Sequence, residues 1–300
     1  MKKIVITGAS GFLGKNLIRR LLKEEGLTLI ALSGRAKDLE AAVRAEIPDA
    51  QIRFADRGVI LEKTAEELFK DAWVINCAFP RNTDGRTRAA GMEYLKELFL
   101  CCERSGAAAV INISSQSLYP ADRTAPAKET DPVSLDSVYA AEKYAVELMA
   151  EGIFSSAGIA CTNIRLASLI GPGFDARIVN RFVRQARENG VIRITDDRKQ
   201  FGFLDVADAA EGLAAMLNSE PKDWRSCYNL GIRGGYMLRE IAGAVKEVMK
   251  ETEDLTVTVE AAKGDGADNS SLDAGAFYDA FGFAPGISLK ESIRRIRLDR

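Results

Sequence analysis

A tyrosine and a lysine stand four residues apart in the segment Tyr139-Ala140-Ala141-Glu142-Lys143. Residues at this spacing share one face of an α-helix, so the ammonium group of Lys143 can lie near the phenol of Tyr139. A nearby cation favours the phenolate and lowers the pKa of a tyrosine from about 10, which a proton shuttle at physiological pH requires. The pair therefore predicts general acid/base chemistry, although the same spacing occurs by chance in many helices.

Three glycines spaced three residues apart, Gly8, Gly11 and Gly14, form a second feature that can bind a ligand. They separate a β-branched run from an amphipathic stretch, which places them in a turn between a first strand and a first helix. Gly8 permits a tight turn, Gly11 lets a pyrophosphate approach the backbone, and Gly14 lets the helix pack closely on the sheet. A Walker A loop is disfavoured because Ala9 and Asn16 stand where it needs glycine and a hydroxyl residue. The remaining alternative is an ordinary strand-turn-helix connection.

Ser33 stands about 20 residues beyond the glycine turn, where Rossmann domains that bind NAD usually carry Asp or Glu. Gly34, Arg35 and Lys37 follow it. The carboxylate that would repel a 2′-phosphate is missing and cations that can bind one are present, which favours NADP over NAD. The alternative is a solvated loop in which Arg35 and Lys37 bind no ligand.

These residues need a sheet to position them, and the sequence predicts a parallel one. Short β-branched runs alternate with longer amphipathic stretches, the rhythm of βαβ units, in which a crossover helix joins parallel neighbours. We expect an α/β fold, a Rossmann-type doubly wound parallel sheet with a smaller C-terminal α/β substrate lobe. The expected strands cover residues 3–7, 27–32, 51–54, 73–78 and 109–114, and the expected helices cover 11–24, 38–45, 89–105 and 137–156.

The alternation breaks at Gly171-Pro172-Gly173. We expect a Rossmann NAD(P)-binding domain over residues 1–168, completed by segments near 203–232, and a substrate-binding lobe from 169–202 and 233–300. Beyond the break we expect helices over 177–188, 206–217 and 238–250, and strands over 191–194 and 255–260.

Composition narrows the classes of function. The chain has 41 basic and 43 acidic residues with no long run of either sign, so we expect no nucleic-acid surface and no membrane anchor. No apolar run approaches the roughly 20 residues that span a bilayer. Five cysteines without a CxxC pair and the absence of histidine argue against a disulfide framework, a metal site and histidine catalysis. We expect a cytoplasmic protein with a small-molecule substrate.

The motifs together resemble the extended short-chain dehydrogenase/reductases, also called the NAD-dependent epimerase/dehydratase family. The resemblance implies that Ser115 hydrogen-bonds the reacting oxygen, Tyr139 transfers its proton and Lys143 orients the ribose, with Ser114 as the alternative to Ser115. The matching segments follow the family's order over nearly the whole chain: Thr7 to Gly14, Asp56, Asn76-Cys77-Ala78, Ile113 to Tyr119, Tyr139 with Lys143, Arg165 to Gly173, and Val206 to Ala210. The cofactor site is assigned to Gly8, Ser10, Gly11, Phe12, Leu13, Gly14, Ser33, Arg35, Asp56, Arg57, Cys77, Ala78 and Lys143.

The chain departs from the family pattern at two segments. Gln116-Ser117 replaces the Asp-Glu pair that serves as acid and base in sugar-nucleotide dehydratases, which disfavours dehydration. Phe201-Gly202-Phe203 replaces an Arg-x-Phe segment whose arginine contacts a substrate pyrophosphate. The missing arginine favours a carbonyl reductase, whereas the Gly171-Pro172-Gly173 turn and the full-length pattern favour a sugar-nucleotide epimerase, and these two are the expected functions. The alternatives are an NADP-linked reductase of a non-nucleotide carbonyl compound and a non-catalytic NAD(P) sensor. The resemblance also implies a homodimer formed through the helices near 89–105 and 137–149.

Overall fold

The computed structural model of the chain describes residues 1–80, 84–174, 177–195, 197–262, 264 and 268–298. The chain divides into two compact units. Unit 1 comprises Met1–Ser114, Asp136–Arg165 and Leu213–Tyr228, and unit 2 comprises Ser115–Leu135, Leu166–Gly212 and Asn229–Arg300. What each unit binds stays a prediction.

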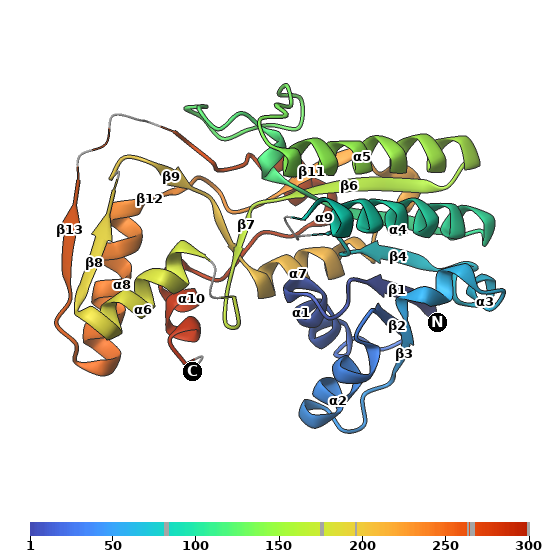
Figure 1. Ribbon diagram of the computed structural model, residues 1–300, viewed down its shortest axis with the longest axis horizontal. Helices are drawn as coiled ribbons and strands as arrows, with labels where there is room; N and C mark the ends of the chain where they lie inside the picture. Colours follow the sequence, from blue (N-terminus) through green and yellow to red (C-terminus); the bar gives the residue numbers. More distant parts are fainter. Residues whose placement is uncertain (81–83, 175–176, 196, 263, 265–267, 299–300) are drawn as a thin grey trace. The chain divides into compact units, whose positions relative to one another are not determined.

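Unit 1 is built around a seven-stranded sheet with the strand order β11-β6-β5-β4-β1-β2-β3 (Figure 1). The neighbouring pairs from β5 to β3 are parallel. The strand order reverses between β1 and β4, and open α/β sheets bind ligands at the carboxyl ends of the strands at such a point. The predicted Rossmann-type α/β fold is confirmed. The strands are β1 (Lys2–Thr7), β2 (Leu27–Ser33), β3 (Ile52–Asp56), β4 (Trp73–Asn76), β5 (Ala109–Ser115), β6 (Ala160–Leu166) and β11 (Cys227–Leu230).

The helices of unit 1 pack on this sheet through residues spaced three or four apart. Phe99 of α4 and Phe154 of α5 meet edge to face with their ring centroids 5.4 Å apart, inside the buried core of the unit. Figure 1 shows α4 and α5 side by side. The helices are α1 (Phe12–Leu21), α2 (Ala36–Glu46), α3 (Ala65–Phe69), α4 (Gly85–Arg104) and α5 (Val138–Ala157).

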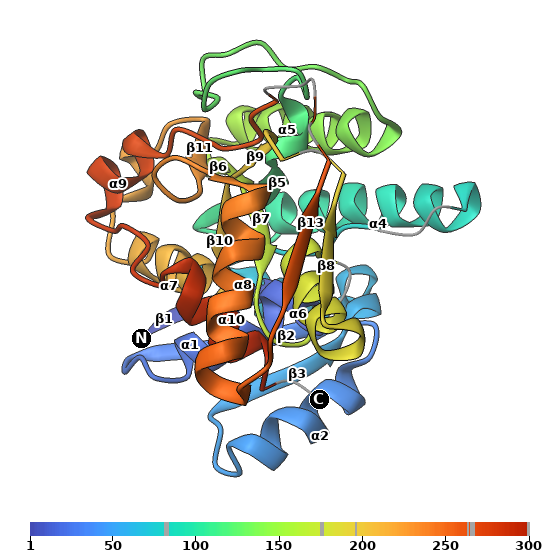
Figure 2. The same ribbon diagram turned by 90° about the vertical axis from the view of Figure 1, so that its left-hand side faces the viewer.

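Unit 2 has its own core, formed where α6, α8 and α10 pack together beside two short strand pairs (Figure 2). β8 pairs in parallel with β13, and β9 pairs antiparallel with β12. A third short pair, β7 with β10, is parallel. The strands are β7 (Ser168–Ile170), β8 (Val191–Ile194), β9 (Gln200–Phe201), β10 (Phe203–Asp205), β12 (Tyr236–Met237) and β13 (Thr258–Ala261). The helices are α6 (Ile178–Asn189), α8 (Leu238–Glu253), α9 (Gly275–Phe281) and α10 (Leu289–Ile296), and α7 (Val206–Met216) continues from unit 2 into unit 1.

Several element boundaries differ from the sequence-based expectations. The strand expected over 73–78 ends at Asn76, because the Asn76 side chain accepts a hydrogen bond from the backbone of Ala78 and turns the chain. The helix expected over 89–105 begins at Gly85, because the Asp84 carboxylate caps it by accepting from the Thr87 amide at 2.9 Å. The helix expected over 11–24 ends at Leu21, and the strand expected over 255–260 begins only at Thr258. The patterns did not predict the helices α3, α9 and α10 or the strands β6, β7, β9, β10, β11 and β12.

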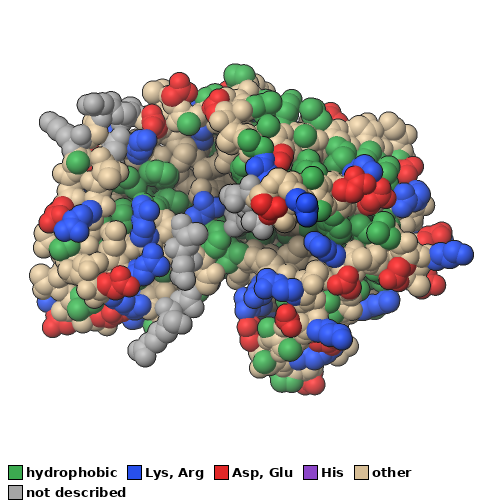
Figure 3. Space-filling model, viewed as in Figure 1, with side chains coloured by type: hydrophobic (Ala, Val, Ile, Leu, Met, Phe, Trp, Pro, Cys, Tyr) green, Lys and Arg blue, Asp and Glu red, His purple; other side chains and the backbone are tan. Residues whose placement is uncertain are grey.

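Charges of both signs are interspersed over the face shown in Figure 3, and hydrophobic side chains gather there over α5. Val138 and Leu148 of α5 are 59% and 50% exposed. Among the residues that the structure describes, no helix is both long and apolar enough to span a bilayer.

Candidate functional site

The carboxyl ends of β1 to β5 lie at one edge of the sheet because these strands are parallel. Most residues that the sequence predicts to form a site stand at these ends or in the turns that follow them. At the strand ends and turns the structure places Gly8, Ser33, Asp56, Cys77, Ala78 and Ser115.

The glycine turn follows β1. Gly8 has a φ of 62°, a left-handed conformation that glycine adopts without steric cost. A Cβ atom at Gly8 would lie 2.5 Å from the backbone nitrogen of Ala78, and one at Gly14 would lie 2.6 Å from the Gly8 carbonyl oxygen. The turn is therefore closed against the end of β4 and the start of α1. Gly11 is the N-cap of α1, so the amide groups of the first turn can bind a phosphate.

The end of β2 is tied to this turn through two hydroxyl groups. Ser33 is 2% exposed, and its hydroxyl donates to the Ser10 hydroxyl oxygen at 2.8 Å. The Ser33 oxygen also accepts from the backbone amide of Arg35 at 3.0 Å. Phe12 and Leu13 form the first turn of α1, with Leu13 buried and Phe12 half-buried. Ser33 thus contacts the glycine turn, and it occupies the position at which a domain that binds NAD usually carries a carboxylate.

The end of β3 lies next to β2 and carries Asp56. The Asp56 carboxylate accepts a hydrogen bond from the Gly58 amide at 2.8 Å and caps a short 3₁₀-helix. The side chain of Arg57 runs along Gly34, where a Cβ atom would lie 3.3 Å from the Arg57 Cδ. The Arg57 guanidinium then lies 5.7 Å from the ring centroid of Tyr94. A cation thus borders the Ser33–Gly34 segment.

A row of buried polar side chains, one threonine hydroxyl and three asparagine amides, crosses the sheet next to the glycine turn. The Thr7 hydroxyl donates to Asn76 Oδ1 at 2.6 Å, and Asn76 Nδ2 donates to Asn112 Oδ1 at 2.9 Å. Asn112 Nδ2 in turn donates to Asn163 Oδ1 at 2.7 Å. All four side chains are at most 3% exposed. Because Asn76 Oδ1 also accepts from the Ala78 amide at 3.1 Å, the row fixes the chain where β4 meets the turn.

Tyr139 and Lys143 lie one turn apart in the first half of α5. Lys143 is 6% exposed, and its Nζ donates to the carbonyl oxygen of Ile113 on β5 at 2.7 Å. The same Nζ lies 4.0 Å from the ring centroid of Phe79. Phe79 also meets the Tyr139 ring, with centroids 5.3 Å apart and the ring planes at 82°. One phenylalanine therefore contacts both members of the expected acid/base pair.

Two ion pairs hold α5 in place around this pair. Arg88 of α4 donates to Glu142 Oε1 from Nε at 3.0 Å and from Nη2 at 2.7 Å. Arg165 of β6 pairs with Glu147 at 2.9 Å, with side chains 7% and 5% exposed. Buried charges are stable only when paired, so the second contact fixes α5 on the sheet.

Ser115 ends β5 and belongs to unit 2, whereas Tyr139 and Lys143 belong to unit 1. The Ser115 hydroxyl donates to Ser117 Oγ at 3.2 Å and accepts from the Ser117 amide at 3.1 Å. The alternative, Ser114, is buried, and its hydroxyl has no hydrogen-bond partner among the described residues. The role of Ser115 towards Tyr139 stays a prediction.

Cys77 lies in the chain segment that closes on Gly8. Burial raises the pKa of its thiol to about 12, and the nearby Lys143 ammonium opposes this only in part. The half-buried Cys77 side chain is therefore a neutral thiol at physiological pH. Within the described part of the chain, no cluster of His, Cys, Asp and Glu is placed to bind a metal ion.

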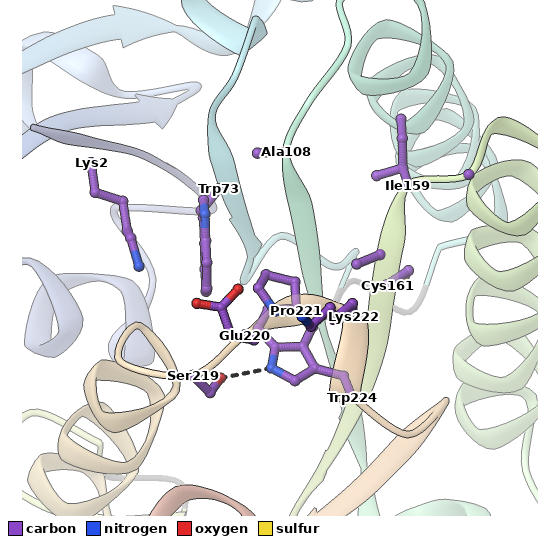
Figure 4. A pocket seen from close by; sticks show the side chains of 12 residues that line it. Lys2, Trp73, Ala108, Ile159, Cys161, Ser219, Glu220, Pro221, Lys222 and Trp224 are labelled. Atoms are coloured by element: carbon purple, nitrogen blue, oxygen red, sulfur yellow. Dashed lines mark hydrogen bonds between the residues drawn. The ribbon is translucent and has the colours of Figure 1, made fainter.

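A cavity of about 670 Å³ lies in unit 1 at the amino ends of the strands (Figure 4). Lys2 packs over the Trp73 ring at 4.0 Å and donates to the Leu217 carbonyl oxygen. Trp224 meets Trp73 edge to face at 5.2 Å and donates to Ser219 Oγ at 2.8 Å. These contacts tie the loop before β11 to the sheet, at the edge opposite the candidate site.

Three residues of the site were not expected from the sequence: Phe79, Asn112 and Asn163. A signal for Asn112 was present, since it interrupts the apolar run from Ala109 to Ile113. The signal for Asn163 was weaker, because β6 also contains Thr162 and Arg165. Phe79 follows Cys77-Ala78 directly, but nothing in the local sequence indicates that its ring meets α5.

The chain matches the model of one protein family over residues 4–231, described as the NAD dependent epimerase/dehydratase family. It is 24% identical over 309 residues to UDP-glucuronic acid decarboxylase 1 of Arabidopsis thaliana, covering 99% of this chain and 69% of that protein. It is 28% identical over 230 residues to UDP-glucose 4-epimerase of Mycolicibacterium smegmatis, covering 69% and 71%. A solved structure of UDP-glucuronic acid 4-epimerase from Bacillus cereus, in complex with UDP-glucuronic acid and NAD, superposes with a TM-score of 0.82 and 18% identity, covering 98% of each chain.

Proposed function

Because this chain belongs to the NAD-dependent epimerase/dehydratase family, it is an enzyme of the NAD-dependent oxidoreductase type, and we propose that it is a sugar-nucleotide epimerase. In this proposal a hydride moves between the nicotinamide and a carbinol or carbonyl carbon, with Tyr139 as general acid/base. The observation that carries the proposal is that α5 presents Tyr139 and Lys143 to one ring, Phe79, beside the glycine turn.

The residues of the turn fit a dinucleotide. The closed backbone at Gly8 and Gly14 leaves no room for side chains there, and the start of α1 supplies amides for a pyrophosphate. With the dinucleotide bound in this way, its nicotinamide would accept or donate the hydride. Lys143 would hold the ribose, and Tyr139 would give or take the proton of the reacting oxygen. Ser115 would donate a hydrogen bond to that oxygen.

We propose NADP rather than NAD as the preferred cofactor. Support comes from Ser33, whose buried hydroxyl stands in place of a carboxylate, and from Arg57, which runs along Gly34. Arg35 adds a second cation next to Ser33. The NAD in the Bacillus cereus structure belongs to that protein, so the choice requires a direct titration.

A second candidate is an NADP-linked reductase of a non-nucleotide carbonyl compound. It is favoured by Phe201, which replaces the arginine expected to contact a substrate pyrophosphate. The Phe201 and Phe203 rings stack with centroids 5.5 Å apart and planes at 6° in the apolar core of unit 2, and neither side chain carries a charge that could bind a pyrophosphate. Retained nucleotide in the purified protein would favour the epimerase, and an empty protein that exchanges NADPH would favour the reductase.

The test of the proposed mechanism is Tyr139→Phe, which keeps the ring and removes the transferable proton. We expect turnover to fall by a factor of about 10² to 10⁴ while NADH and NADPH bind as before, measured by fluorescence titration. Unchanged turnover would exclude Tyr139 as the acid/base. A protein that binds neither nucleotide would overturn the cofactor assignment.

We also propose a homodimer formed through α4 and α5. The exposed apolar side chains of Val138 and Leu148 on α5 support it, because monomers rarely leave large apolar surface open to water.

A further inference from the structure

We infer that Phe79 is a positioning residue that holds the Lys143 ammonium and the Tyr139 ring in their working places. The inference rests on the proposed function, since it matters only if this pair transfers a proton beside a nicotinamide. Phe79 follows the end of β4, and the pair lies on α5, so one side chain joins two elements that form the site.

The contact with Lys143 has the geometry of a cation–π interaction. Nζ lies 4.0 Å from the Phe79 ring centroid, well inside the roughly 6 Å over which the ring quadrupole attracts a cation. Lys143 is 6% exposed, so the ammonium is largely removed from water and the attraction is weakly screened. The Ile113 carbonyl oxygen, 2.7 Å away, holds the same Nζ from β5. The ring and the carbonyl together restrict where the ammonium can lie.

The contact with Tyr139 is edge to face, the favoured geometry for two aromatic rings. Because Phe79 touches both side chains, it sets the distance between them as well as their separate orientations. A phenylalanine ring has no exchangeable proton, so it can orient the pair without entering the proton transfer. The alternative is that Phe79 only fills space at the end of β4.

A first experiment detects the contact without cofactor. Methylene protons next to an ammonium that lies over a ring face are shifted upfield by the ring current. We expect such a shift for the Lys143 Hε signal of the cofactor-free protein, assigned by its loss in Lys143→Arg and followed by NMR with [¹³C]lysine. Phe79→Leu, which keeps an apolar side chain, should return the signal to the ordinary lysine position. An ordinary lysine chemical shift for the Lys143 Hε signal of the unmodified protein would overturn the inference.

A second experiment separates the effect of the ring quadrupole from the effect of the ring's shape. Phenylalanines with one, two or three ring fluorines at position 79 weaken the quadrupole and leave the packing nearly unchanged. We expect the Kd for NADPH, the proposed cofactor, to rise stepwise, by roughly ten-fold across the series, because Lys143 is less firmly held for the ribose. The matched control is the same series at Phe99, whose ring packs edge to face against Phe154 in the apolar core.

The outcomes of the two experiments are distinct. A flat series at position 79, or an equal response at Phe99, would show that the ring only fills space and would overturn the inference. In a protein that binds neither NADPH nor NADH, the proposed function fails, while the Lys143 signal still decides whether Phe79 holds the ammonium.

Discussion

Asn76 on β4 donates a hydrogen bond to Asn112 on β5, with 2.9 Å between Nδ2 and Oδ1, in the interior of the sheet. The strand register places Thr7 beside Asn76 and Asn76 beside Asn112, so three polar side chains meet in one row. Each amide is both donor and acceptor, which lets the row continue to Asn163 with its members paired. The row joins the strand before the glycine turn to the strand that ends at Ser115.

Asn112→Ala should therefore destabilise the protein strongly. The change leaves Asn76 Nδ2 and Asn163 Oδ1 without their partner and opens a cavity, which we expect to lower the free energy of unfolding by about 2 to 4 kcal/mol. Urea denaturation followed by circular dichroism measures it. Asn218→Ala, at an exposed position, is the control and should change stability little. Equal effects of the two substitutions would contradict a structural role for the row.

Glu147→Gln should also be costly, because it leaves the Arg165 guanidinium buried without its counter-charge. Removal of one partner of a buried pair typically costs about 3 to 5 kcal/mol. Glu46→Gln removes an ion pair with Arg19 that is even shorter, 2.6 Å against 2.9 Å, but there the side chains are 49% and 44% exposed. That control should cost at most about 1 kcal/mol in the same denaturation assay. A loss of stability of about 1 kcal/mol or less for Glu147→Gln would show that the α5–β6 ion pair is not buried in solution.

Cys77 should resist alkylation in the native protein. Burial raises the pKa of its thiol to about 12, so the reactive thiolate is scarce at pH 8 and its population rises as the pH approaches that value. Iodoacetamide labelling read by peptide mass spectrometry should show slow modification that speeds up with pH. The urea-denatured protein, in which the thiol is in water, provides the control. Rapid labelling of native Cys77 at pH 8 would mean that the segment beside Gly8 is open.

Leu148→Asp should dissociate the proposed dimer, because it places a charge on the exposed apolar face of α5. We expect sedimentation velocity at micromolar concentration to give a dimer for the unmodified chain and a monomer for the variant. Leu61→Asp is the matched control, since Leu61 is 73% exposed and lies in the 3₁₀-helix after β3. An unmodified chain that sediments as a monomer would remove the dimer from the proposal.

The sequence by itself determined the fold class, the family, and the local frame of the site. Gly8 and Gly14 predict a tight turn from the sequence alone, because the absence of a side chain and the freedom of the backbone are properties of each glycine itself. The spacing of Tyr139 and Lys143 predicts a shared helix face for the same reason, and α5 has both in its first half. Their chemical roles, and that of Ser115, stay predictions.

The tertiary structure alone decided which distant residues meet these local features. Phe79 contacts α5 across about 60 positions of sequence, and the Asn76–Asn112–Asn163 row exists only in the observed strand register. The partner of Glu147 likewise comes from another element, β6, which the sequence pattern did not predict. Periodicity reports which face of one helix or strand is buried. The register and packing that bring two elements together depend on the free energy of the whole core.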